Sequence, residues 1–225
     1  MKYSTLKSYR PALQSYLKKV DPEVVNKVLK GVFNDRPPTA RYTSIWDVNL
    51  LLAYLGSMIV TTDMDISTKL ATLMMVLSGN RVNMLSHLKV SKMFITEDEC
   101  TFVFDEVLKH SRPGFKDGPM TFRVFPDYHI CPVHTLKQYL DMRLPRSSED
   151  ALFLTTTQPY RGVSSDTIAR WIKTMMQLAG IDTGLFGAHS CRAASTSTAS
   201  FKGVSLTTSV SLLLGLQTQL SKKFI

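Results

Sequence analysis

The sequence predicts a mainly α-helical protein with one small antiparallel β-sheet, which is an α+β fold. Apolar residues recur at helical spacing through most of the 225 residues, and only three short segments near the middle are instead rich in aromatic and β-branched residues. The composition, with 44% hydrophobic and 20% charged residues, is typical of a globular protein and argues against a disordered chain.

Two helices are predicted at the beginning of the chain. The first begins after Ser4, a suitable N-cap, and its apolar residues recur every three or four positions as far as Leu17. The second runs from Pro22 to about Phe33, because proline suits the first turn of a helix. Two short helices enclose little core, so this pair is expected to be a small module or part of one.

The segment Asn-Asp-Arg-Pro-Pro at positions 34–38 is the strongest breaker in the sequence and predicts a domain boundary. It separates residues 1–38, a small helical domain with its linker, from a main domain at 39–225.

The net charge is +9, and residues 1–45 alone carry +6 of it, which makes nucleic acid the first partner to test. A solvated helix surface is the alternative. The candidate phosphate contacts of this basic region are Lys7, Arg10, Lys18, Lys19, Lys30, Arg36 and Arg41.

The main domain is predicted to consist of helices around three strands. Its predicted helices cover about 45–58, 65–78, 132–142, 164–179, 190–202 and 205–215, and its predicted strands cover 93–95, 101–104 and 120–125. The second of these helices ends at Ser78-Gly79-Asn80, a typical helix stop. A long loop from Asp105 to Pro119 joins the second and third strands.

Several functional classes are excluded by what the sequence lacks. It has no apolar run long enough to cross a bilayer and no apolar segment of the kind that follows the basic start of a signal peptide. Its three cysteines are too widely spaced for a disulfide framework, which indicates a reducing compartment. The pairs Cys131/His134 and His189/Cys191 lack a second pair at metal-ligand spacing, and no glycine-rich phosphate loop is present. We therefore expect no metal, no cofactor and no membrane partner.

Four basic or proton-donating residues from three separate segments suit the binding of a phosphate group. Arg81 follows the predicted helix stop, Lys109 lies on the long loop, and His189 and Arg192 are three residues apart, on one face if they begin a helix. Each Arg can offer two parallel donors to phosphate oxygens, and Lys and His can move protons. The alternatives are an Arg that caps helix carbonyls and a Lys that is simply solvated.

These segments resemble the tyrosine recombinases, the phage-integrase family. Leu77–Leu85 resembles their first arginine motif, Val107–Gly114 their hairpin lysine region, and Gly187–Arg192 their His-x-x-Arg box. The chain is more similar still to recombinases of DIRS-like and Crypton-like mobile elements of eukaryotes. The segments that carry this likeness are Lys30–Asn34 with Arg36–Pro38, Trp46–Val48, Ser111–Gly114, Ala179–Asp182 and His189 with Arg192–Ser195.

The resemblance implies a tyrosine-recombinase-like catalytic domain that acts on double-stranded DNA in the nucleus, as a homo-oligomer assembled on DNA. In this family a tyrosine hydroxyl attacks a DNA phosphodiester and forms a 3′-phosphotyrosyl link. Arg81 and Arg192 would neutralise the phosphate oxygens, Lys109 would protonate the leaving 5′-oxygen, and His189 would accept a proton or donate a hydrogen bond. Lys116 is the alternative for the lysine.

The sequence departs from the family at the nucleophile. None of the eight tyrosines lies beyond Tyr160; Ile225 stands near the expected tyrosine position and Leu216 at the Trp/His position, while Ser221 is a poor substitute. Met84 replaces the acidic residue that follows the first arginine.

We therefore expect a recombinase-type domain without strand-cleavage activity. Residues 1–38 resemble a remnant of a helical, SAM-like core-binding domain, and 39–225 resemble a catalytic domain truncated at its C-terminus, as in a decayed gene copy or a gene model cut at wrong exon boundaries. Two alternatives stay open: a relic or regulator that only binds DNA, and a helical protein-interaction domain with no role on DNA.

Overall fold

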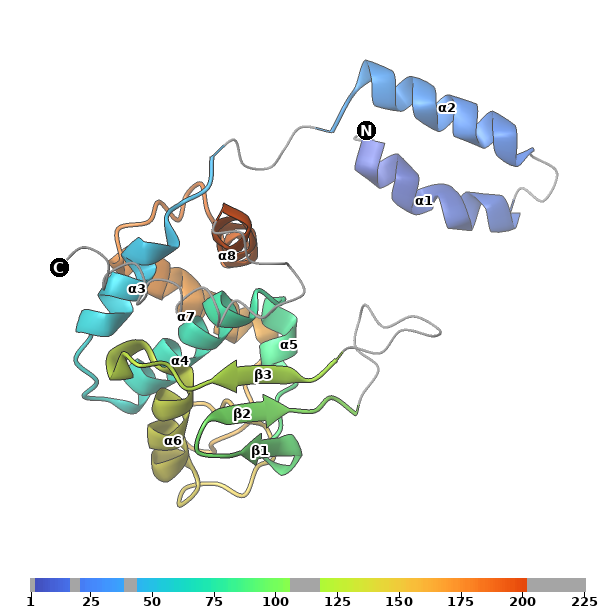
Figure 1. The fold of residues 1–225 in the computed structure, drawn as a ribbon. Helices are drawn as coiled ribbons and strands as arrows, with labels where there is room; N and C mark the ends of the chain where they lie inside the picture. Colours follow the sequence, from blue (N-terminus) through green and yellow to red (C-terminus); the bar gives the residue numbers. More distant parts are fainter. Residues whose placement is uncertain (1–2, 17–20, 39–43, 106–117, 202–225) are drawn as a thin grey trace. The chain divides into compact units, whose positions relative to one another are not determined.

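The chain divides into two compact units, one within residues 1–44 and the other within 45–225 (Figure 1). The computed structural model describes residues 3–16, 21–38, 44–105 and 118–201. The division falls between Ser44 and Ile45, whereas the sequence-based boundary was placed after residue 38.

The smaller unit contains two helices, α1 (Tyr3–Tyr16) and α2 (Pro22–Asp35), which contact each other. Helix α2 begins where the sequence predicts, because the Asp21 carboxylate accepts a hydrogen bond from the Glu23 amide at 2.8 Å and Pro22 occupies the first turn. The rings of Tyr3 and Phe33 meet edge to face across the pair, with centroids 5.2 Å apart. No residue of α2 is buried, so this pair encloses little core.

The larger unit is built around one central helix. Its helices are α3 (Val48–Ser57), α4 (Asp63–Ser78), α5 (Val82–Ser86), α6 (Pro132–Arg143), α7 (Ser165–Leu178) and α8 (Ser190–Phe201), with short 3₁₀ turns at Val90–Lys92 and Tyr128–Ile130. Every residue of α4 from Ile66 to Leu77 is buried, and α4 contacts each of the other five helices. A helix that is buried on all sides is the axis of a domain, and the functional residues must lie at its ends or on its neighbours.

A three-stranded antiparallel sheet covers part of this core. Strands β1 (Met93–Ile95), β2 (Glu99–Phe102) and β3 (Met120–Arg123) pair in the order β1-β2-β3. Cys100 is paired with Phe122, and both side chains are buried on the face that β3 turns toward α4 and α6. The opposite face carries hydroxyl groups, because Thr101 and Thr121 are hydrogen-bonded across the strands at 2.9 Å.

The predicted fold class, mainly α with a small antiparallel sheet, is confirmed. Helix α5 and the two 3₁₀ turns were missed, because segments of five or three residues are too short to show a helical period in the sequence. The second and third strands end two residues earlier than predicted. The helix predicted at 205–215 lies outside the described residues. Within the described ranges, no helix is long and apolar enough to span a membrane.

Candidate functional site

Arg81 lies at the junction between helices α4 and α5. Gly79 ends α4 in the left-handed conformation, with φ +59°, which glycine adopts without strain, and this turns the chain so that Arg81 is extended at the start of α5. The Arg81 carbonyl accepts the Met84 amide at 2.9 Å. Its side chain is exposed and makes no capping hydrogen bond. Within the described residues its guanidinium also has no ion-pair partner, so it remains available to an anion.

His189 and Arg192 lie at the start of helix α8. The turn that leads into α8 is closed by hydrogen bonds from the amide of Ser190 to the Gly187 carbonyl, at 2.8 Å, and from the amide of Cys191 to the Ala188 carbonyl, at 3.2 Å. His189 and Arg192 are exposed, whereas Ser190 and Cys191 between them are buried. The His-x-x-Arg spacing therefore turns both functional groups outward while the intervening residues hold the helix to the core.

Arg81 and the turn that carries His189 and Arg192 are both attached to elements that pack against helix α4. Arg81 follows the C-terminal end of α4, and α5 and α8 each contact α4 (Figure 1). Lys109 and its alternative Lys116 lie outside the part of the chain that the structure describes, as do Leu216, Ser221 and Ile225. Three of the four predicted phosphate-binding residues can thus be located, and each of the three is exposed.

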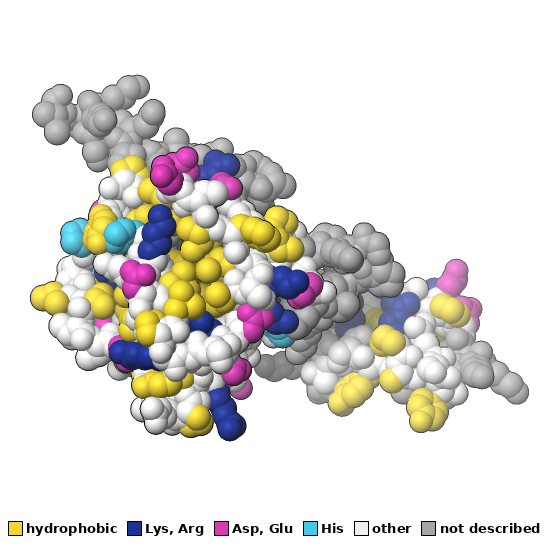
Figure 2. Space-filling model, turned by 90° about the horizontal axis from the view of Figure 1, so that it is seen from below, with side chains coloured by type: hydrophobic (Ala, Val, Ile, Leu, Met, Phe, Trp, Pro, Cys, Tyr) yellow, Lys and Arg dark blue, Asp and Glu magenta, His cyan; other side chains and the backbone are white. Residues whose placement is uncertain are grey.

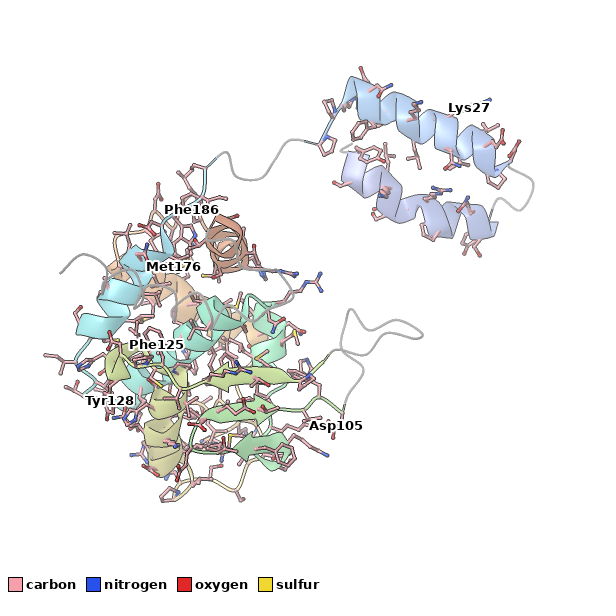
Figure 3. All side chains as sticks on the ribbon, in the orientation of Figure 1. Lys27, Asp105, Phe125, Tyr128, Met176 and Phe186 are labelled. Carbon is pink, nitrogen blue, oxygen red and sulfur yellow. The ribbon has the colours of Figure 1, made fainter. Side chains whose placement is uncertain are left out.

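A pair of lysines holds the chain just beyond strand β2. Asp105 follows β2 (Figure 3), and its carboxylate pairs with the Lys92 ammonium at 3.0 Å and the Lys89 ammonium at 3.9 Å. The hydrogen bond from Lys92 lowers the pKa of Asp105 below its ordinary value. These lysines were not predicted as functional residues. Their positive charges are partly neutralised by this carboxylate.

Three predicted DNA-binding residues line one concave surface of the smaller unit. Lys7 and Arg10 of α1 and Lys30 of α2 surround an open hollow, and the four other described residues that line it are uncharged. Arg36 differs, because its guanidinium pairs with Asp35 at 3.0 Å. The other predicted contacts, Lys18, Lys19 and Arg41, fall outside the described residues.

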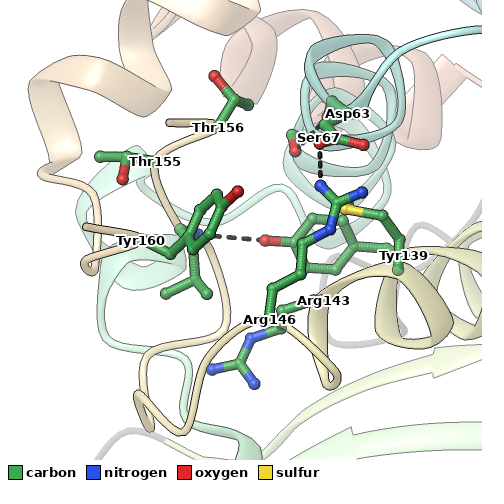
Figure 4. Close-up of a pocket in the computed structure, with 10 residues that line it drawn as sticks. Asp63, Ser67, Tyr139, Arg143, Arg146, Thr155, Thr156 and Tyr160 are labelled. Atoms are coloured by element: carbon green, nitrogen blue, oxygen red, sulfur yellow. Dashed lines mark hydrogen bonds and ion pairs between the residues drawn. The ribbon is translucent and has the colours of Figure 1, made fainter. Parts of the chain in front are cut away.

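In the larger unit, charges of both signs occur together. Figure 2 shows basic and acidic side chains interspersed over its visible face. A small pocket of this unit is lined by residues of α4, α6 and the segment 154–160, including Tyr139 and Arg143 (Figure 4). Arg146 pairs there with Asp63. Within the described residues, no group of three His, Cys, Asp or Glu side chains could hold a metal ion.

Two residues that line this pocket, Tyr139 and Arg143, have a structural role that the sequence analysis did not predict. Arg143 is buried and gives its donors to backbone carbonyls, the Nε to Leu152 at 3.2 Å and an Nη to Ala151 at 2.6 Å. The Tyr139 hydroxyl donates to the Leu152 carbonyl at 3.0 Å and accepts the Leu154 amide at 3.1 Å. These groups fix the segment that follows α6, and their spacing in the sequence carries no sign of it.

This chain resembles known proteins in its three-dimensional structure. No family model and no curated protein matches the chain. XerH site-specific recombinase bound to difH substrate, in a pre-cleavage complex, matches with a TM-score of 0.53 and 14% identity over 90% of this chain. The Tn1549 transposon integrase in complex with transposon right end DNA matches with a TM-score of 0.52 and 11% identity, over 91% of this chain and 74% of that one.

The post-cleavage complex of XerH with palindromic difH substrate gives a TM-score of 0.50 at 16% identity, again over 90% of this chain. The chain spans about 60% of the length of the XerH chain in both complexes. The described structure therefore has the fold of the site-specific recombinases and integrases, as the sequence resemblance to tyrosine recombinases predicts.

Proposed function

We propose that this chain binds double-stranded DNA along its phosphate backbone as a recombinase-type domain, with Arg81, His189 and Arg192 around one phosphate group. The observation that carries the proposal is that all three side chains are exposed, on elements held against α4, in a chain with the recombinase fold. An exposed, unpaired guanidinium keeps its planar donors for two oxygens of one phosphate. Lys109 is the fourth member of the proposed site, on the basis of its sequence resemblance.

The hollow of the smaller unit supplies a second set of phosphate contacts in this proposal. Lys7, Arg10 and Lys30 line it, and the other described residues around it are uncharged. Contacts of this kind give affinity and position without reading base sequence. We place Arg36 among the weaker contacts, because its neutralising partner Asp35 must be displaced or shared.

The proposed role is binding without strand cleavage by these 225 residues. The tyrosine-recombinase reaction needs a tyrosine hydroxyl near the phosphate, and no tyrosine follows Tyr160 in this sequence. The two arginines would still neutralise a phosphate without a nucleophile. Assembly of several copies on DNA, and nuclear DNA of a mobile element as the target, belong to the same proposal and are supported by the resemblance of segments such as Trp46–Val48.

The salt dependence of duplex binding tests the phosphate contacts. Each neutralised phosphate contributes about 0.9 to the slope of log K against log salt concentration. Because Arg81 and Arg192 are proposed to hold the same phosphate, the double variant Arg81→Ala/Arg192→Ala should lower the magnitude of that slope by about 0.9. Arg170→Ala is the control for each single variant, Arg81→Ala and Arg192→Ala, because it also removes one exposed guanidinium, here one on α7 that donates to Thr167.

Two outcomes would contradict the proposal. Equal slopes for the wild type and the double variant would show that Arg81 and Arg192 do not contact DNA, and would favour the helical protein-interaction alternative. A covalent protein–DNA adduct with a suicide substrate would overturn the absence of cleavage.

A further inference from the structure

We propose that Trp46 is a positioning residue for the His189–Arg192 turn, acting through Ser190; this inference rests on the proposed function. The Trp46 indole Nε1 donates a hydrogen bond to the Ser190 Oγ at 2.9 Å in a buried environment. Trp46 is 7% exposed and Ser190 is 3% exposed. The two residues are 144 positions apart, so the bond joins opposite ends of the larger unit's sequence.

Ser190 is the residue through which such a bond can act on the site. It is the first residue of α8, it follows His189 directly, and it precedes Arg192 by two positions. The side chains of His189 and Arg192 are exposed, so no packing contact fixes their direction. The position of each side chain is therefore set by the backbone of this turn. A displacement of about 1 Å is enough to weaken a positioned phosphate contact markedly.

Few other polar contacts hold α8 in place. Its buried face consists of small residues such as Ala194 and Ser195, and the Ser195 Oγ is buried without a hydrogen-bond partner. Among the described side chains, the other hydrogen bond from α8 to a different element is the weak sulfur contact between Cys191 and Met176 of α7, at 3.6 Å. Small side chains let α8 slide along its neighbours at little cost, whereas the directional Trp46–Ser190 bond fixes its first turn.

The indole also makes the bond specific. Tryptophan Nε1 can only donate a hydrogen bond, and a buried donor without an acceptor costs free energy. The Trp46 indole is therefore satisfied when Ser190 lies in its observed position. The chain places Trp46 directly before α3, and α3 itself contacts α8. The ring and the helix that follows it therefore support the same turn.

The test uses Trp46→Phe, which keeps an aromatic ring but removes the donor, and Ser190→Ala, which removes the acceptor with a smaller change of volume. Trp171→Phe is the matched control, because Trp171 is 8% exposed and its indole makes no hydrogen bond within the described residues. Binding of each full-length variant to a duplex is measured at fixed salt, in the presence and absence of Arg192→Ala. Thermal unfolding of each variant is recorded in parallel.

We expect Trp46→Phe and Ser190→Ala each to weaken duplex binding about 5- to 10-fold, within the range of coupling between interacting residues. In the Arg192→Ala background the same substitutions should have a clearly smaller effect, because Arg192 is gone and His189 is the one group of the proposed site that the turn still positions. Trp171→Phe should lower the melting temperature without weakening binding at temperatures where it is folded.

Each contrary outcome identifies what has failed. If Arg192→Ala weakens binding but Trp46→Phe and Ser190→Ala give the same fold-loss with and without Arg192, the positioning role is overturned and the proposed function stands. If Trp171→Phe weakens binding as much as Trp46→Phe, the effect is general destabilisation and the inference fails. If Arg192→Ala alone leaves binding unchanged, the proposed function fails, and the positioning role is refuted with it.

Discussion

The hydroxyl of Tyr139 should be a major support of the larger unit, and Tyr139→Phe isolates it. The substitution keeps the ring, which is 1% exposed, and removes one oxygen atom. That oxygen donates to the Leu152 carbonyl at 3.0 Å and accepts the Leu154 amide at 3.1 Å. Burial raises the pKa of Tyr139 above its ordinary value, so the hydroxyl is protonated at neutral pH and can play both roles there.

The expected loss follows from which partners remain satisfied. The Leu152 carbonyl keeps a hydrogen bond from the Arg143 Nε at 3.2 Å, so its loss is partial. The Leu154 amide belongs to a residue that is 5% exposed and would be left without its acceptor. An orphaned buried amide costs about 1–3 kcal/mol, so we expect unfolding to become easier by about 2 kcal/mol. For a unit of this size that corresponds to a fall of about 4–8 °C in melting temperature.

Urea unfolding followed by circular dichroism measures this free energy. Tyr128→Phe is the control, because it removes a hydroxyl that is hydrogen-bonded to Gln138 on the exposed surface and should cost under about 0.5 kcal/mol. A loss below about 0.5 kcal/mol for Tyr139→Phe, or equal losses for the two variants, would refute the reasoning. The segment that Tyr139 holds also bonds back to the chain after α5, through the Leu152 amide and the Leu88 carbonyl at 2.7 Å.

Three further predictions concern buried thiols, a helix cap and a helix stop. Burial raises the pKa of Cys100 and of Cys191 to about 12, and Cys131 is also buried, so no thiol should react with a disulfide reagent at pH 8 until denaturant is added; rapid labelling of the native protein would contradict this. Burial raises the pKa of Asp65, but hydrogen bonds from the threonines before α4 outweigh it and hold that pKa below its ordinary value. Asp65→Ala should therefore cost about 1 kcal/mol above about pH 5, and the difference from wild type should shrink as the pH falls below about 4 and the wild-type carboxylate is protonated; urea unfolding at both pH values would show a constant difference if the reasoning is wrong. Gly79→Ala forces a Cβ into the left-handed region and should cost about 1–2 kcal/mol in the same assay, and an unchanged stability would show that the turn before Arg81 can relax.

Local patterns predicted those parts of the fold that are set locally. The stop at Ser78-Gly79-Asn80 was predicted from residue types, and Gly79 adopts the left-handed conformation that such a stop requires. The sheet was predicted because its segments are rich in aromatic and β-branched residues, and in β2 and β3 the buried positions alternate with more exposed ones. The five-residue helix α5 was missed because fewer than two turns give no period.

Long-range contacts could not be predicted, for a physical reason. The bond between Trp46 and Ser190 joins residues that have no sequence relation until the fold brings them together. Arg143 looks like any basic residue at a helix end, and only its burial against backbone carbonyls shows a structural role. Arg81 and Arg192 were singled out as candidates by residue type and spacing, and their role in a site stays a prediction.

The burial of helix α4 on all sides has a consequence for the dynamics of the site. Amides in its centre, from Ile66 to Leu77, can exchange with solvent hydrogen only when the whole unit opens. Helix α8, held by small side chains and one directional bond, should exchange through local opening at lower free energy. Arg81 is thus attached to the most slowly exchanging element and Arg192 to a faster one. A phosphate that bridges them would leave exchange in α4 nearly unchanged and slow it in α8, so the protection of α8 would report the ligand.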